Sequence, residues 1–228
     1  ISAIWLGTQN AAREIVSEMA IYKRERMFNL YIYPYIFSKI SVLSFFSIVQ
    51  SLIFILILTF HYNGSNVMVE INDPIYLFFW MVFLSISATF LGLLLSSLVK
   101  TSERAMTILP LILLPQIMLA GLVAKVSNGI VEFISYFTLS RWGVEGFNII
   151  QVNIIENFPD FSGGVVKVEK DSLTLLLNQF HEYYREKDIF GELTGTLKLD
   201  VIIILIMVIF MTFFIFNTLK KKDSITIR

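Results

Sequence analysis

The chain has 228 residues, of which 56% are hydrophobic and only 16% are charged. Soluble domains usually carry about 45–50% apolar and about 25% charged residues, so this balance favours the membrane class. Basic and acidic residues are equal, at 18 each, and there are no cysteines, which excludes the basic field of a nucleic-acid-binding protein as well as disulfides and cysteine-ligated metals.

Four stretches of the sequence are long, apolar and free of charge. A helix needs about 17–25 mostly apolar residues to cross the hydrocarbon layer of a membrane. The charge-free runs are Ile40–Phe60, Pro74–Val99, Ala105–Ala124 and Val201–Leu219. We therefore predict an all-α integral membrane protein, a helical bundle with spans over residues 36–60, 74–99, 105–124 and 200–219.

The first residues of the chain are also apolar, but the run is short. Residues 1–12 end at Arg13 and Glu14, which predicts the cytoplasmic end of a span whose beginning is missing. The opening stretch has no basic start followed by a cleavage site, so we expect no signal peptide. We interpret residues 1–228 as a single membrane-domain fragment of a longer chain.

The distribution of lysine and arginine over the short loops predicts the orientation. Residues 13–39, 100–104 and 220–228 carry basic residues, whereas residues 61–73 carry none. The basic segments are expected in the cytoplasm and the neutral loop outside. Alternation then puts residues 125–199 outside, as a large external loop that is too long for its own charges to decide its side.

Small residues recur at helical spacing in the second full span. Ser85, Ala88, Thr89, Gly92 and Ser96 share one helix face. Small residues let two helices approach closely in lipid, so plain helix packing is the favoured interpretation. A face that lines a translocation path is the alternative, and it makes Thr89 a candidate path residue.

The third full span contains two prolines, Pro110 and Pro115, and the second is followed by Gln116. Proline removes a backbone donor and bends a helix. A bent helix with one amide is typical of a path or gate, and it is equally typical of a helix bent to fit its neighbours. Pro115 and Gln116 are therefore also candidate path residues. No ionisable residue lies in the charge-free runs, which argues against a proton-coupled carrier.

The sequence shows no catalytic or metal-binding constellation. His61 and His181 have no second ligand at useful spacing, and the acidic residues of the large external loop are interleaved with basic ones, as on a solvated surface. There is no paired acid set, no Ser-His-Asp set and no phosphate-binding loop. We predict no catalytic residue, no metal and no cofactor in this segment.

The stretch from Arg13 to Leu30 lacks glycine and proline and has helical spacing. One face is predicted to carry Ile15, Met19 and Tyr22, and another Glu14, Glu18 and Glu25. An amphipathic helix resting on lipid headgroups is one interpretation. Three glutamates oppose it because anionic lipid would repel them. A helix that docks onto a cytoplasmic partner explains the mixed charge better.

The connector resembles the membrane domain of ABC type 2 exporters, specifically the G-type (White, pleiotropic-drug-resistance) branch. The matching residues there are Arg13, Glu14, Glu18, Arg24, Glu25, Arg26, Tyr35, Ser38 and Lys39. Two later segments are also similar to that family: Pro115–Gln116 with Gly121, and Ser140–Trp142 with Glu145. Ser140 stands where the family usually has proline.

This resemblance implies a membrane domain of six spans, of which the chain would hold the end of the second and all of the third to sixth. Residues 13–30 would be the cytoplasmic coupling helix. Its contacts to a nucleotide-binding domain would come from Glu14, Glu18, Arg24, Glu25 and Arg26. Because these positions lie outside the lipid, we expect Glu18→Ala or a charge reversal at Arg24 or Arg26 to leave folding intact.

The resemblance also implies partners. An ATPase domain that binds ATP and Mg would lie upstream, in the same polypeptide, and a second copy of the membrane domain would complete the transporter. Residues 125–150 would form short re-entrant helices in the outer leaflet. The interfacial aromatic residues there would be Phe133, Tyr136, Phe137, Trp142 and Phe147.

The favoured function is therefore the permease part of an ATP-driven exporter, forming half of the translocation path and coupling to a nucleotide-binding domain. A passive channel or membrane scaffold subunit without ATP coupling is the alternative, and only the charged connector opposes it. An intramembrane enzyme is disfavoured, because its motifs are missing. The composition suggests a bacterial inner (plasma) membrane as the location.

Overall fold

The structure is a computed structural model that describes residues 1–28, 30–64, 74–120, 129–156 and 197–226. Every regular element in these ranges is a helix, which confirms the all-α prediction. In chain order the helices are α1 (Ser2–Ala11), α2 (Glu14–Ser17), α3 (Met19–Arg26), α4 (Ile32–Gly64), α5 (Pro74–Leu98), α6 (Ser102–Leu119), α7 (Gly129–Ser135), α8 (Leu139–Glu156) and α10 (Leu197–Thr226). Residues 157–196 of the expected external loop lie outside the described ranges.

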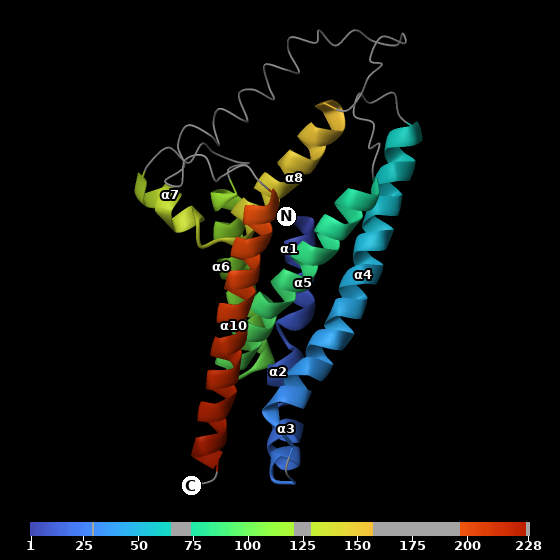
Figure 1. The fold of residues 1–228 in the computed structure, drawn as a ribbon. Helices are drawn as coiled ribbons and strands as arrows, with labels where there is room; N and C mark the ends of the chain where they lie inside the picture. The colour runs from blue at the N-terminus through green and yellow to red at the C-terminus, as the bar shows by residue number, and fades with distance from the viewer. Residues whose placement is uncertain (29, 65–73, 121–128, 157–196, 227–228) are drawn as a thin grey trace.

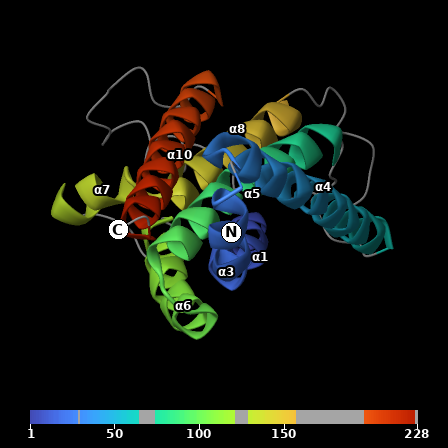
Figure 2. The same cartoon turned by 90° about the horizontal axis from the view of Figure 1, so that it is seen from below.

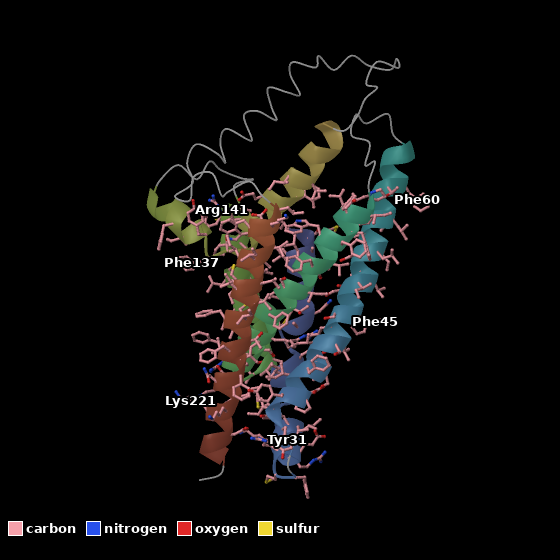
Figure 3. The ribbon with its side chains drawn as sticks, in the orientation of Figure 1. Tyr31, Phe45, Phe60, Phe137, Arg141 and Lys221 are labelled. Carbon is pink, nitrogen blue, oxygen red and sulfur yellow. The ribbon has the colours of Figure 1, made fainter. Side chains whose placement is uncertain are left out.

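Four helices are long and apolar enough to cross a membrane: α4, α5, α6 and α10. Helix α4 has 33 residues, which at about 1.5 Å per residue gives about 50 Å, longer than a hydrocarbon layer of about 30 Å. Its first turns therefore extend beyond the hydrocarbon and reach the connector. The α4 side chains Phe45 and Phe60 are exposed and point away from the bundle, as expected for lipid-facing residues (Figure 3).

Helix α5 lies at the centre of the bundle. It contacts α1, α4, α8 and α10, and α4 and α10 flank it on opposite sides (Figures 1 and 2). In its most apolar stretch 56% of the residues are buried, against 22% in each of the other three spans. The remaining spans therefore present most of their apolar surface to the outside of the chain.

Helix α1 packs on α5 through two glycines. A Cβ at Gly92 would meet the Thr8 carbonyl oxygen and would lie 2.7 Å from the Ala11 Cβ. A Cβ at Gly7 would meet the Ser85 carbonyl oxygen. The small face of α5 is thus buried against α1, so the structure supports the packing interpretation of that face.

Helix α8 crosses α5 near the other end, again over glycines. The Trp80 indole Nε1 donates to the Gly143 carbonyl oxygen at 3.0 Å, and a Cβ at Gly146 would meet the Trp80 ring. The indole of Trp142 is only 1% exposed, and its Nε1 donates to the Tyr136 carbonyl oxygen at 2.9 Å. Trp142, one of the predicted interfacial aromatic residues, is thus buried within the bundle, beneath the turn from α7 to α8.

Two ionisable residues lie on the long helices just before the charge-free runs. Helix α10 begins at Leu197 and includes Asp200, which is completely buried. The position is compatible with charge because it lies in the first turn, where the helix dipole favours an anion. Likewise α4 begins at Ile32 and includes Lys39, in the turns that reach the connector.

The close α1–α5 contact leads to a prediction. We expect Gly92→Ala to destabilise the protein by about 1–3 kcal/mol, because the added methyl meets the backbone of α1 and cannot be accommodated by a rotamer change. Gly143→Ala is the control, since its methyl would meet only the ends of flexible side chains, the Leu84 methyl groups at 3.0 and 3.1 Å and the Ile4 Cδ1 at 3.7 Å. Thermal unfolding in detergent measures both. Equal melting temperatures for the two variants would contradict the close packing of α1 on α5.

Candidate functional site

The connector, residues 13–30, forms two short helices rather than the single helix expected from the sequence. The chain turns at Glu18, where φ is −99° and ψ is 7°. The backbone N–H groups of Ile15 and Val16 donate to the Ser96 Oγ of α5, at 3.0 Å each. A side chain of the bundle thus satisfies the free donors at the start of α2, which fixes α2 against α5 and lets α3 run in its own direction.

One face of the connector is buried against the spans, as its spacing predicts. Ile15 and Tyr22 belong to an apolar cluster with residues from α4 and α10. The rings of Tyr22 and Tyr35 lie 4.7 Å apart between centroids. The cluster also contains Ile215 and Leu219, both fully buried. The connector is therefore packed onto the ends of two spans rather than lying free beside them.

Lys39 of α4 joins the two halves of the connector. Its Nζ lies 3.1 Å from the Glu14 Oε2 and 2.5 Å from the Glu18 Oε2. Glu14 is in α2, and Glu18 is at the turn before α3. One ammonium group therefore holds both carboxylates to the first turns of α4.

A second charged group ties α3 to the end of α10. The Arg26 Nε donates to the Asp223 Oδ2 at 2.8 Å, and the Tyr22 hydroxyl donates to the same oxygen at 3.3 Å. The Arg26 guanidinium also donates to the Leu30 carbonyl oxygen. Burial raises the pKa of Tyr22 to about 12, and the negative charge of Asp223 contributes to that rise.

The remaining charged residues of α3 point outward. The side chains of Arg24 and Glu25 are exposed, and neither forms an ion pair with another described residue. Beside them Met27 and Phe28 are also exposed, Phe28 to 84%. The five predicted docking residues thus divide into two groups: Glu14, Glu18 and Arg26 are paired within the chain, and Arg24 and Glu25 are available to a partner.

The three predicted path residues lie in different surroundings. Thr89 is fully buried, and its Oγ1 donates to the Ile86 carbonyl oxygen at 2.6 Å. Pro115 is exposed on α6. The Gln116 Oε1 accepts the Ser140 backbone N–H at 3.0 Å, and the Ser140 hydroxyl donates to the Gln116 carbonyl oxygen. Gln116 thus joins α6 to α8, and the three residues share no common surface.

Polar residues on α1 were missed by the sequence reasoning. The Trp5 Nε1 donates to the Gln9 Oε1 at 3.0 Å, and both side chains are exposed. Asn10 Nδ2 donates to the Gln50 Oε1 of α4 at 2.9 Å. Because Gly7 and Thr8 pack on the middle of α5, these amides lie at the depth of a span. The spacing of four residues between Trp5 and Gln9, which puts both on one helix face, was the signal in the sequence.

Asp223 and Lys39 were also missed as site residues. Asp223 is the one acidic residue that follows Lys220, Lys221 and Lys222, and Lys39 is the charge just before the first long apolar run. Lys39 was matched to the family's connector without a role, and Asp223 stands out only as an acidic residue after three lysines. Their partners are far away in the chain, so no local spacing rule pairs them.

The family model described as ABC-2 type transporter matches residues 1–152, a range that includes the connector and the helices α4 and α5 on which it packs. The chain belongs to the ABC-2 type transporter family. It is a permease domain, and the permease domain of this family carries no catalytic activity of its own. The G-type branch stays a prediction.

A curated relative of this ABC-2 domain is an ABC transporter ATP-binding/permease protein of Mycobacterium tuberculosis. The two are 27% identical over 146 residues. The alignment covers 63% of this chain and 17% of the relative, so the chain spans only a small part of that protein's length. No solved structure matches the chain.

The buried phenol of Tyr22 leads to a second prediction. Its pKa lies above the ordinary value of 10, at about 12, so the folded state keeps a proton that the unfolded state loses. The stabilisation is full below pH 10 and is lost as the pH rises from 10 to 12. We expect the melting temperature to fall more steeply over this range in the wild type than in Tyr22→Phe. Exposed Tyr31→Phe is the control; an identical slope for wild type and Tyr22→Phe would contradict the buried position of the phenol.

Proposed function

We propose that the chain is the membrane-spanning part of an ATP-driven exporter that couples to a nucleotide-binding domain through the outward face of α3. The observation that carries this proposal is the division of the connector charges. Glu14, Glu18 and Arg26 bind the connector to the spans, while Arg24 and Glu25 remain exposed. A helix that transmits force needs both a fixed inner face and a free outer face.

The exposed apolar side chains beside those charges support a protein partner. Ile21, Met27 and Phe28 are exposed next to Arg24 and Glu25. Protein interfaces combine an apolar core with charged groups that fix the docking geometry. A passive channel or scaffold, the alternative function, has no need for such a surface. The M. tuberculosis relative, whose name joins an ATP-binding and a permease part, favours an ATPase domain in the same polypeptide, with ATP and Mg bound there.

The orientation follows from the ends of the bundle. The connector and the end of α10 lie at the same end of the molecule, where Tyr31 and Lys221 are labelled in Figure 3. Basic residues gather there, in the connector and at residues 220–222. The positive-inside rule then favours a cytoplasmic location for this end, and a bacterial inner membrane agrees with the mycobacterial relative.

The exposed face of α1 is the best-supported candidate for the path. An amide such as Gln9 is costly to expose to hydrocarbon. Water in a path, or a second copy of the domain, would cover Trp5 and Gln9 at lower cost. Helix α6, which carries the exposed Pro115, contacts α1. We therefore infer that α1 and α6, rather than the buried Thr89, form this domain's half of the path.

A third prediction tests the docking face. In the full-length transporter, a fluorescent reporter on a cysteine that replaces the exposed Met118 of α6 is expected to respond to ATP, Mg and vanadate. The double variant Arg24→Glu, Glu25→Arg should reduce the response by about tenfold or more, since charged pairs buried at an interface are worth about 2 kcal/mol or more. Its melting temperature should stay unchanged, because both side chains are exposed.

The control is Lys220→Glu, a charge reversal at an exposed position of α10, which should leave the response intact. A full response in the double variant would show that α3 does not dock on the ATPase domain. The internal pairs revise one expectation from the sequence: Glu18→Ala and Arg26→Ala should lower the melting temperature, because each removes a partner from a part-buried ion pair.

A further inference from the structure

The end of the last span meets the connector across 197 residues of sequence, at the bond between Arg26 and Asp223. Asp223 lies in the last turns of α10, and its residue is 9% exposed. A carboxylate at such a position is stabilised only while it has partners. Arg26 and Tyr22, both on α3, supply them through the same oxygen. Separation of α10 from α3 would leave this carboxylate without either.

Apolar contacts hold the same two elements together. Ile215 and Leu219 on α10 and Tyr22 on α3 belong to one buried cluster. On the side of α4, the Tyr33 ring stacks on Phe216 at 4.7 Å between centroids. The interface thus has a buried carboxylate at its centre and an apolar surround, which links α10 to the connector.

This end of α10 also contacts α5. Lys222 Nζ donates to the Val99 carbonyl oxygen, near the end of α5, at 3.3 Å, and Leu93 of α5 belongs to the same apolar cluster as Ile215 and Leu219. A displacement of α3 would therefore act on α10 through the Asp223 bonds, against the packing of α10 on α5.

Helix α10 carries such a displacement to the opposite end of the bundle. It is continuous over 30 residues, about 45 Å at 1.5 Å per residue. Near its other end it packs on α8 and buries Asp200. Rigid helices with discrete packing arrangements are a physical means by which distant sites are coupled.

We propose that Asp223 is a positioning residue that makes α10 a second route by which the connector acts on the spans, besides the route through Lys39 and α4. The ATPase domain would move α3, and the Arg26–Asp223–Tyr22 group would move α10 and, with it, the outer part of the domain around α8. This inference rests on the proposed docking of α3.

The experiment compares two reporters in the full-length transporter in lipid nanodiscs. One fluorescent label replaces the exposed Ile202 at the outer end of α10, and the other replaces Met118 on α6. The signal is the change on addition of ATP, Mg and vanadate. In Asp223→Asn we expect the Ile202 response to fall about tenfold, equivalent to about 1.4 kcal/mol, while the Met118 response changes little. The reciprocal exchange Arg26→Asp, Asp223→Arg should restore the Ile202 response.

The outcomes separate the two proposals. Undiminished Ile202 signal in Asp223→Asn, with or without a lower melting temperature, would overturn the role of Asp223 and leave the docking proposal standing. No response at either label in the wild type would overturn the docking proposal itself, and this inference with it. Where Asp223→Asn does not fold, the variant Tyr22→Phe replaces it, because it keeps the ion pair and removes only the hydrogen bond from the Tyr22 hydroxyl to Asp223. An Ile202 response equal to that of the wild type would then count against the inference, and a smaller response would support it.

Discussion

The close approach of α1 to α5 determines where the connector lies. Gly7 and Gly92 let the two backbones come into contact, and this brings the end of α1 next to Ser96. The Ser96 hydroxyl then binds the first backbone donors of α2. A larger side chain at either glycine would push α1 outward and remove α2 from its cap. The position of the connector, and hence of its outward charges, follows from this contact between two helices in the middle of the bundle.

The connector charges serve two purposes that composition alone does not distinguish. Lys39 and Asp223 each neutralise connector residues of opposite sign in part-buried positions, where a lone charge would be costly. Once those residues are paired inward, Arg24 and Glu25 are left on the outside. The same arrangement leaves the ABC-2 family domain with an exposed charged surface on α3, and ties that surface to the first and last of its four long helices, α4 and α10.

The opposite end of the domain, around α8, is built on a different principle. There the aromatic side chains Trp80 and Trp142 each donate a hydrogen bond to a backbone carbonyl, and Gly146 of α8 makes room for the Trp80 ring. Gln116 joins α6 to α8 through two bonds with Ser140. Phe137 stays exposed near the buried Arg141 (Figure 3). The contact between α6 and α8 therefore explains why an amide, Gln116, follows Pro115, without requiring that Gln116 line a translocation path.

The sequence by itself determined the all-α membrane class, because runs of about twenty uncharged residues have few other stable environments. It also determined the buried face of the connector, since the spacing of Ile15 and Tyr22 is a local helical property. Only the tertiary structure decided which connector charges point inward, because the partners Lys39 and Asp223 are 25 and 197 residues away from Glu14 and Arg26. It also decided that Trp142 is buried and that Gln116 binds α8, since both depend on how α8 crosses its neighbours. Local periodicity specifies which face of a helix is apolar, but the choice of a partner for a charge depends on which helices meet.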